Sequence, residues 1–585
     1  MKLALFFLFF IQVAFPQSKI DLGSDALDDP DENQYMEQLL TSIFQRINIE
    51  TADSTALKDR GYSQQGIESI LSWQNQEGRK GSTRWLAKQL HDEDLVLMEH
   101  DLTTASSLTQ CQFRQRLQYS PSLDGWRLLH KGRLWNRWGS VNILTEQDPG
   151  ESQLTDHSIF TLNIDALHGF QNIILGDFHV NWGGGLILNQ QGSRASLNPG
   201  SLMRKSVLTI RPHYSSRESD YFHGLASQFS FMNMRGAAFL SSRKEIGLMQ
   251  DGEFREDADG IHPIGKTFQI YRSKTLGLAM ERYGSGFQLY GSALYHPQER
   301  SGIDYELGFL KAFNDSHHIQ VFTNGLDLND SRILLTWTYS TKPVILSLQY
   351  RRYCSDSESS SGAMPTLLGS SAKNEGGLSF RAQIRPGKTM RIRYALETGS
   401  SVKVNSCFDY RSIQHHKIQF TRKLNHGECQ LDFSRRREQP IIQGDVWNAH
   451  FTQAEIYKEA LSLLHQFSPN LIYRINLKAA LDGHETAWLV QQRFSGKHGL
   501  WKWTIGYTRY GVPDYVLRLS IYETSVAESF SFYTCYDDGD RCFLYLKQQT
   551  QNGFDLELKL DQTRSFDPLM PSKQLALSFQ MSVVL

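Results

Sequence analysis

Apolar residues recur at every second position through most of the chain beyond about residue 106. The pattern is clear over 333–339, is repeated over 344–350 after a turn, and pairs 380–384 with 390–396 across another turn. Because side chains on a strand alternate between its two faces, this spacing predicts strands with one apolar face. Gly, Asp, Asn and Pro separate the runs, which is typical of antiparallel hairpins.

These runs are longer than an average globular strand and approach the length that crosses a membrane. The chain ends on such a run, with apolar residues at every second position from Leu575 to Leu585. We therefore expect a mainly β fold, a large antiparallel transmembrane β-barrel over 106–585, closed by pairing of its last strand with its first. Hairpin spacing predicts about 14–18 strands, an even number. A soluble β-sandwich or an open periplasmic sheet is the alternative.

The first residues have the order of features found in a secretory signal. Lys2 precedes an apolar run from Leu3 to Phe15, and no later stretch approaches the length of a membrane-spanning helix. We expect a cleaved signal peptide over 1–18, followed by an acidic flexible lead-in over 19–33. Export and the barrel together predict the cell outer membrane.

Residues 34–105 have a different periodicity. Apolar residues recur there at spacings of three and four, which is typical of amphipathic helices. One such stripe is formed by Ile67, Ile70, Leu71 and Trp73. We expect a compact all-α module over 34–105, located in the periplasm and too small to be a catalytic domain by itself.

Composition changes this picture little. Hydrophobic residues make up 40%, charged residues 21%, and the net charge is -1. The mean hydropathy of -0.42 fits a soluble protein as well as a barrel with a polar lumen. The aromatic share of 12% favours a barrel, because aromatic girdles lie at both membrane interfaces. The near-zero charge predicts no general attraction to nucleic acid or anionic lipid.

The six cysteines fit no metal-binding spacing. Cys535 and Cys542 flank Asp538-Gly539, and a two-residue turn there would place the two cysteines opposite each other on one hairpin. In that register they fall on a hydrogen-bonded pair, where a disulfide is strained. A Cys535–Cys542 disulfide and two free thiols both stay open.

Short motifs occur in both parts of the chain. They are Ile47-Asn48-Ile49-Glu50-Thr51-Ala52, Gly61-Tyr62-Ser63, Leu175-Gly176-Asp177-Phe178, Trp182-Gly183-Gly184-Gly185-Leu186, Ile210–Glu218 and Phe222–Ala226. Together they resemble the motifs of a family from the Bacteroidetes phylum, often described as helix-hairpin-helix or ComEA-like proteins, which joins such a module to a large outer-membrane barrel. The resemblance covers most of residues 34–400 and implies the same two-part organisation.

The resemblance also implies DNA binding without sequence preference, through hairpin backbone amides, helix N-termini and nearby cations. The family's Leu-Pro-Gly-x-Gly hairpin is replaced here by Asp59-Arg60-Gly61-Tyr62-Ser63, which keeps only the first glycine. These departures favour a module that keeps the fold but acts as a periplasmic plug or adaptor. The residues implied at a DNA phosphate are Lys58, Arg60, Gly61, Tyr62, Ser63, Arg79 and Lys80.

The barrel motifs are interpreted as structural. The glycine run at 183–185 lacks the Lys-Ser/Thr of a phosphate loop, and glycine permits a bend, a bulge or close packing in a curved sheet. Asp177 and Glu218 are expected to be lumenal charges that pair with arginines such as Arg211 and fasten an inward-folded segment. The residues given this role are Gly176, Asp177, Gly183, Gly185, Arg211, Glu218 and Gly224.

The sequence has no nucleophile elbow, zinc-protease motif or CxxC pair, so we expect no enzyme and no catalytic, cofactor or metal site. The expected function is transport or a channel, with the module as plug or adaptor. A DNA-uptake protein that uses the module, and a non-conducting scaffold that docks partner proteins, are the alternatives. The expected partners are outer-membrane lipid, the barrel-assembly machinery, other envelope proteins and, in the first alternative, DNA.

Overall fold

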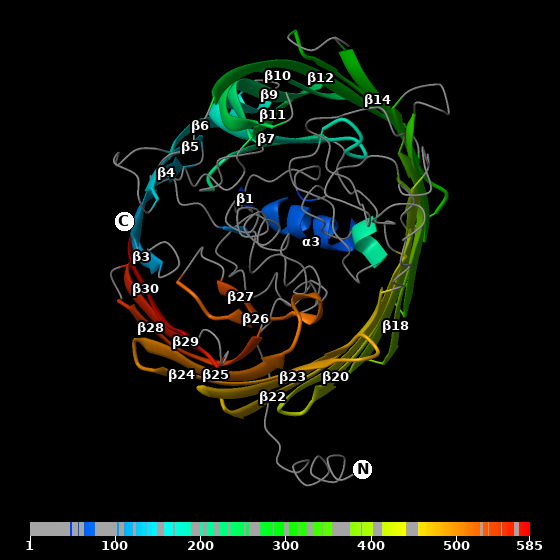
Figure 1. The fold of residues 1–585 in the computed structure, drawn as a ribbon. Helices are drawn as coiled ribbons and strands as arrows, with labels where there is room; N and C mark the ends of the chain where they lie inside the picture. Colours follow the sequence, from blue (N-terminus) through cyan, green and yellow to red (C-terminus); the bar gives the residue numbers. More distant parts are fainter. Residues whose placement is uncertain are drawn as a thin grey trace.

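The period-two alternation builds one closed sheet in the computed structural model of the chain (Figure 1). In the described part, 24 antiparallel strands form the wall. They are β3 Gln110–Ser120, β4 Gly125–Asn136, β5 Gly139–Gln147, β6 His157–Leu167, β7 Phe170–Trp182, β9 Phe222–Phe231, β10 Met234–Gln250, β12 Gln269–Gly284, β13 Phe287–Tyr295, β14 Ile303–Ala312, β15 His317–Asn324, β16 Arg332–Ser340, β17 Val344–Tyr353, β18 Glu375–Gly387, β19 Met390–Ser401, β20 Ser412–Leu424, β21 Gly427–Gln439, β22 Ala454–Ser468, β23 Leu471–Leu481, β24 Thr486–His498, β25 Trp501–Val512, β28 Asp537–Gln549, β29 Phe554–Ser565 and β30 Ser572–Val584.

The structure describes residues 47–48, 57, 64–75, 102–103, 110–120, 125–136, 138–148, 157–167, 170–188, 199–202, 208–215, 221–231, 234–250, 253–256, 269–284, 286–297, 303–314, 316–324, 331–341, 343–353, 375–387, 389–401, 412–439, 454–526, 531–535, 537–550, 553–566 and 572–584. The predicted signal peptide over 1–18 and the lead-in over 19–33 lie outside these residues. No described helix is long and apolar enough to cross a membrane.

The predicted closure of the barrel is confirmed. β30 pairs with β29 on one side and with β3 on the other, in a register that runs from Gln112 opposite Val584 to Tyr119 opposite Leu577. The predicted hairpins are also present, for example β16–β17 and β18–β19. The sheet therefore has no free edge in the described wall.

The predicted number of strands, about 14–18, was too low. The wall has 24. One end of the barrel is closed by very short turns, such as 285–286 between β12 and β13 and 388–389 between β18 and β19. A strand with its connection therefore uses less of the chain than the hairpin spacing assumed, and more strands fit into the same length.

The two ends of the barrel differ in the length of their connections. The end opposite the short turns carries long connections, such as 354–374 between β17 and β18 and 440–453 between β21 and β22. The chain enters β3 and leaves β30 at the short-turn end. This asymmetry matches that of outer-membrane barrels, which have short periplasmic turns and longer extracellular loops.

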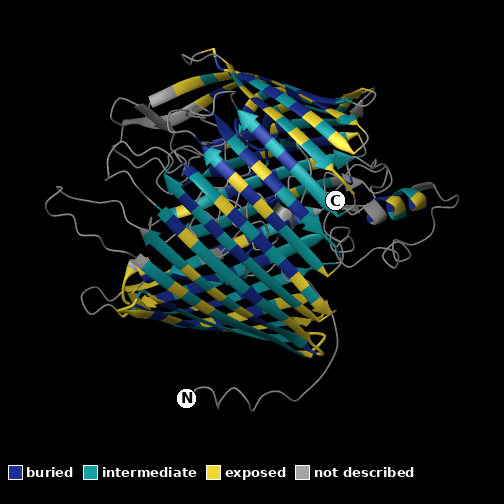
Figure 2. Cartoon of the chain, turned by 90° about the vertical axis from the view of Figure 1, so that its right-hand side faces the viewer, coloured by how far each residue is buried: buried dark blue, intermediate teal, exposed yellow. Residues whose placement is uncertain are grey.

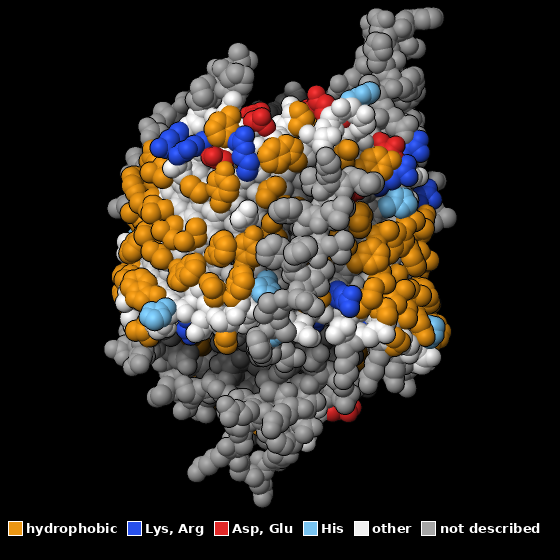
Figure 3. All heavy atoms as spheres, turned by 90° about the horizontal axis from the view of Figure 1, so that it is seen from below, with side chains coloured by type: hydrophobic (Ala, Val, Ile, Leu, Met, Phe, Trp, Pro, Cys, Tyr) orange, Lys and Arg blue, Asp and Glu red, His pale blue; other side chains and the backbone are white. Residues whose placement is uncertain are grey.

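Apolar and polar side chains lie on opposite faces of the wall. On β17, Leu348 and Tyr350 are about two-fifths exposed, whereas the alternate residues Ser347, Gln349 and Arg351 are buried toward the lumen. Figure 2 shows this alternation along the strands. Figure 3 shows a band of hydrophobic side chains on the outer face, with most of the charged side chains along its upper margin. The apolar face therefore points away from the lumen.

Of the module expected over 34–105, the structure describes one helix, α3 Gln64–Asn75. Its Ile67, Ile70 and Trp73 are buried, on the face that the sequence pattern predicts. The module is not purely helical, because β1 Ile47–Asn48 pairs in parallel with β2 Leu102–Thr103. The rest of 34–105, apart from Leu57, lies outside the described residues.

Short elements lie inside the ring of wall strands. They are η3 Pro199–Leu202, η5 Tyr515–Leu517, β26 Leu519–Glu523 and β27 Ser531–Cys535 (Figure 1). Two further strands attach to the wall, β8 Leu208–Pro212 to β7 and β11 Glu253–Glu256 to β10. We call residues 183–188 with η3 the first lumen segment, and residues 515–526 with β27 the second lumen segment.

Candidate functional site in the barrel lumen

The first lumen segment leaves the wall at the end of β7. Gly183 and Gly185 have φ values of 55° and 84°, which only glycine adopts readily. A Cβ atom on Gly183 would lie 2.2 Å from Oε1 of Glu306, so the chain passes directly against a wall side chain. These glycines let the backbone turn from the wall into the lumen.

A buried carboxylate and a buried guanidinium hold this turn. Glu306 on β14 accepts hydrogen bonds from the backbone N–H groups of Gly184 and Leu186, the latter at 3.0 Å. Arg332 on β16 donates to the Leu186 carbonyl at 2.7 Å. Both wall side chains are almost completely buried. The inward turn thus uses two opposite charges to satisfy backbone groups that have no strand partner.

Apolar packing completes the attachment of the first lumen segment. Its Leu186, Ile187 and Leu188 are fully buried with Trp182 and Phe322 in the largest apolar cluster of the described chain. Further along, Ser347 donates to the Pro199 carbonyl at 2.8 Å, and Gln349 donates to the Leu202 carbonyl at 3.4 Å. The segment therefore reaches from β7 to β17.

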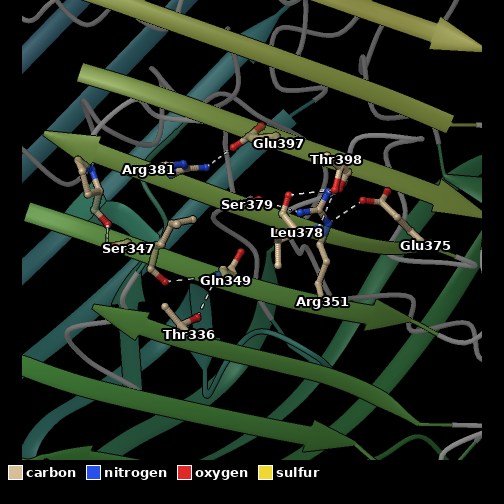
Figure 4. A network of polar contacts seen from close by, with 12 residues as sticks. Thr336, Ser347, Gln349, Arg351, Glu375, Leu378, Ser379, Arg381, Glu397 and Thr398 are labelled. Carbon is tan, nitrogen blue, oxygen red and sulfur yellow. Dashed lines mark hydrogen bonds and ion pairs between the residues drawn. The ribbon is translucent and has the colours of Figure 1, made fainter. Parts of the chain in front are cut away.

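Next to these contacts, the inner wall carries a network of ion pairs (Figure 4). Arg351 donates to Glu375 at 2.7 Å, to the Ser379 hydroxyl at 2.8 Å and to the Thr398 carbonyl at 2.9 Å. Arg381 forms an ion pair with Glu397 at 2.5 Å. Each of these two arginines is paired with a carboxylate, so this part of the inner wall carries little net charge.

The second lumen segment packs against β23, β24 and β25. Leu517, Leu519, Ile521 and Cys535 are fully buried against Ala480, Ala487, Leu489, Tyr510 and Val512. Wall lysines bind its backbone, because Lys478 donates to the Ser520 carbonyl at 2.8 Å and Lys458 to the Arg518 carbonyl at 3.3 Å. The segment is therefore held on one side by apolar contacts and by charge-assisted hydrogen bonds.

Glu523 attaches the end of β26 to the adjoining wall strands β28 and β29. Its carboxylate is completely buried and accepts two hydrogen bonds from Arg541 and one from Lys559, at 2.7, 3.0 and 2.8 Å. Asp561 pairs with Arg541 at 2.7 Å. Two cations and two carboxylates thus form a neutral, buried cluster between the second lumen segment and β28 and β29.

The motif residues around Asp177 meet near the middle of β7. Gly176 lies directly opposite Gly224 on β9, and a Cβ on either would come within about 2 Å of a carbonyl oxygen, at 1.9 Å and 2.1 Å respectively. The Asp177 carboxylate accepts from the Phe160 N–H at 2.8 Å and pairs with His223 at 2.8 Å. These contacts connect neighbouring wall strands.

The sequence also predicts Arg211 and Glu218 in this network. Arg211 lies on β8 opposite His179 of β7, whereas Glu218 lies outside the described residues. The ion-pair partner found for Asp177 is a histidine of β9. Nearby, the buried rings of His179 and His213 approach to 2.5 Å between nitrogen atoms.

The residues that the family resemblance implies at a DNA phosphate cannot be placed in this site. Lys58, Arg60, Gly61, Tyr62, Ser63, Arg79 and Lys80 all lie outside the described residues. Within the described part, no group of His, Cys, Asp and Glu side chains is arranged to hold a metal ion.

The expected hairpin between Cys535 and Cys542 is not formed. Asp538 and Gly539 lie inside β28, which pairs with β25 and β29 over its length, and both cysteines are free. Cys535 is buried on β27, while Cys542 is exposed on the wall. Pairing with two wall strands overrides the local turn preference of Asp-Gly.

The charged lumen residues were not singled out from the sequence. They are Glu306, Arg332, Arg351, Glu375, Arg381, Glu397, Glu523, Arg541 and Lys559. A signal was present, because several of them occupy the polar positions of an otherwise alternating strand, as Arg351 does beside Tyr350. Which of these charges meet depends on strand number and register.

Comparisons with protein-family models and with curated proteins found no match. Several solved structures are similar. The copper transporter OprC is 10% identical, with 82% of this chain and 80% of that chain covered and a TM-score of 0.42. The FrpB iron transporter from Neisseria meningitidis (F3-3 variant) is 6% identical, with 82% of each chain covered and a TM-score of 0.41. The siderophore receptor PirA from Acinetobacter baumannii is 9% identical, with 83% and 82% covered and a TM-score of 0.41. These values are too low to assign a family or a ligand.

Proposed function

We propose that this chain is an outer-membrane barrel that transports a solute through a lumen gated by its own inward-folded segments. The apolar outer band fits a lipid environment, and the polar inner face fits an aqueous path. The short-turn end, where the chain enters β3, would face the periplasm. A module over 34–105 at that end would act as plug or adaptor.

The observation that carries the proposal is the attachment of the second lumen segment. Through Glu523, β26 binds the cluster of Arg541, Lys559 and Asp561 on β28 and β29. The backbone of the second lumen segment is bound by other wall strands. A segment held at two sides by different contacts can be released at one side. Such a segment suits a gate better than a permanent filler.

Planar-bilayer conductance tests this function. We expect the native protein to conduct little, because the second lumen segment stays attached. Glu523→Gln removes the charge that binds Arg541 and Lys559 and is expected to raise the frequency of open events. Glu455→Gln is the matched control, since Glu455 lies on the outer face and pairs with Arg435 there.

If Glu523→Gln conducts no more than the native protein, while its second lumen segment is demonstrably detached, the gate is refuted. The barrel would then act as a non-conducting scaffold for partner proteins. If Glu455→Gln opens the barrel equally often, the opening is caused by general destabilisation of the barrel. The proposed role of Glu523 in holding the second lumen segment is then refuted.

A further inference from the structure

Three cations lie together on the outer face of β10 and β12, toward the long-connection end of the barrel. Lys244 of β10 is the direct cross-strand partner of Arg272 of β12, and Lys274 follows Arg272 on the same face two residues along the strand. All three side chains are exposed, whereas the alternate residues Arg243 and Thr275 are buried. We call Lys244, Arg272 and Lys274 the outer cation patch.

The outer cation patch borders directly on the apolar band of the outer face. The next row toward the short-turn end contains only apolar side chains, each between 44% and 62% exposed. From β9 to β14 they are Leu225, Leu240, Leu276, Tyr295 and Ile303. A tyrosine at the margin of an apolar band is typical of the membrane interface. The outer face therefore changes from lipid contact to positive charge at the level where lipid headgroups begin.

The described part of the chain supplies no anion to the outer cation patch. None of its three side chains forms a hydrogen bond or an ion pair with another described residue. By contrast, Arg435 lies on the outer face toward the same end of the barrel and is paired with Glu455 of the neighbouring strand. Like charges at directly opposite positions destabilise a sheet, so an external anion would stabilise this part of β10 and β12.

The spacing of the three cations suits a group that carries phosphate. The Cβ atoms of direct cross-strand partners are about 5 Å apart, and diagonal neighbours such as Lys244 and Lys274 are about 7–8 Å apart. Long side chains that start this close together can bring their charged ends to one phosphate. Arg272 offers parallel N–H groups to two phosphate oxygens, and the two lysines add flexible point charges.

We propose that Lys244, Arg272 and Lys274 bind the phosphate-bearing headgroup of a lipid in the outer leaflet of the outer membrane. The acyl chains of this lipid lie against the adjoining apolar row that contains Leu240 and Leu276. The headgroup belongs to the outer leaflet because the long connections of an outer-membrane barrel face the cell exterior. The site lies on the outer face and does not depend on the proposed gate.

Lipid binding to the full-length protein in a non-ionic detergent tests the site. The probe is diphosphoryl lipid A, and native mass spectrometry counts the bound lipid over a series of lipid concentrations. Lipid A from which both phosphates have been removed keeps the acyl chains and measures the apolar contribution alone. We expect the native protein to bind the phosphorylated lipid at least about tenfold more tightly, because each cation near a lipid phosphate contributes to binding.

Variants at exposed positions make this result specific. Arg272→Gln is expected to weaken binding of the phosphorylated lipid about fivefold, and the triple variant with Lys244→Gln and Lys274→Gln to lose the preference for it. Arg282→Gln is the matched control, because Arg282 is an exposed cation on the outer face of the same strand at the short-turn end. Its binding is expected to equal that of the native protein. The Tm without lipid is expected to be similar in all four proteins, because surface substitutions change stability little.

Three outcomes would overturn the site. Equal binding of both lipids by the native protein, or an undiminished preference in the triple variant, would mean that the outer cation patch contacts no lipid phosphate. A loss in Arg282→Gln as large as that in Arg272→Gln would assign binding to the general charge of the barrel. If inorganic phosphate alone raises the Tm of the native protein but not of the triple variant, the ligand is a small anion and not a lipid.

Discussion

The guanidinium of Arg541, on wall strand β28, donates two hydrogen bonds to the carboxylate of Glu523 on the inner strand β26, at 2.7 and 3.0 Å. This bidentate pair joins an element inside the lumen to the membrane-facing sheet. Both side chains are almost completely buried, so the contact is not screened as a surface ion pair would be. The position of the second lumen segment therefore depends strongly on one carboxylate.

Glu523→Ala is expected to release β26 from β28 and β29. Removing one partner of a buried ion pair typically costs about 3–5 kcal/mol, because the remaining charges stay buried without compensation. Amide hydrogen exchange measured by mass spectrometry is expected to become faster in 519–523 while exchange in β28 and β29 changes little. Glu455→Ala removes a solvent-exposed carboxylate of the outer face and is expected to leave exchange over 519–523 unchanged, because exposed ion pairs contribute little to stability. Unchanged exchange over 519–523 in Glu523→Ala would contradict the assignment.

The attachment at Glu523 has a defined pH dependence. Burial alone would raise the pKa of Glu523, but the charges of Lys559 and Arg541 outweigh burial and hold the pKa below its ordinary range. A depressed pKa in the folded state means that the carboxylate stabilises the attachment fully above the ordinary value of about 4.3. This contribution is lost as the pH falls through the lowered folded value.

Protease sensitivity of the second lumen segment at decreasing pH measures this dependence. In the native protein we expect constant protection down to about pH 4 and release only at more acidic pH. Glu523→Gln cannot ionise at this position, so its sensitivity to protease is expected not to change with pH over that range. Release already at about pH 6 would assign the switch to a histidine and not to Glu523.

Gly183 is expected to tolerate no side chain. Its φ of 55° is unfavourable for other residues, and an added Cβ would collide with the carboxylate of Glu306. Gly183→Ala is therefore expected to lower the free energy of unfolding by about 1–3 kcal/mol and to loosen the first lumen segment. Gly387→Ala is the matched control, because Gly387 has open space around its Cβ position and no positive φ. Equal Tm values for the two variants would show that the turn at Gly183 is not constrained.

The parts of the fold that the sequence predicts are those encoded by local alternation. On β16, Trp337 alternates with Thr336 and Thr338, and the run that ends the chain closes the barrel on β3. The number of strands was not encoded in this way. The number of strands depends on how short the connections are. In addition, strands such as β22 carry charged residues on both faces, so their alternation is too weak to identify them as strands from the sequence.

The lumen contacts could not be predicted, for a physical reason. The hydrogen bond between Gly184 and Glu306 spans 122 positions, and the one between Ser347 and Pro199 spans 148. Such pairs meet only when the barrel has the correct number of strands and register. A one-residue shift of register would turn Glu306 to the outer face. Local sequence can also mislead: Asp538-Gly539 is typical of a tight turn, but it lies within strand β28.

Cys535 and Cys542, which the sequence predicts to lie opposite each other on one hairpin, can be used to check that β27 and β28 do not form this hairpin. Burial raises the pKa of the Cys535 thiol, so it is protonated and unreactive in the folded protein. Cys542 is exposed on the outer face of β28. A small apolar maleimide is therefore expected to label Cys542 in detergent-solubilised protein and to label Cys535 only after unfolding. Mass spectrometry of peptides from protein alkylated without reductant makes the measurement. A recovered Cys535–Cys542 disulfide, or equal labelling of both thiols in the folded protein, would show that β27 and β28 are connected as a hairpin after all.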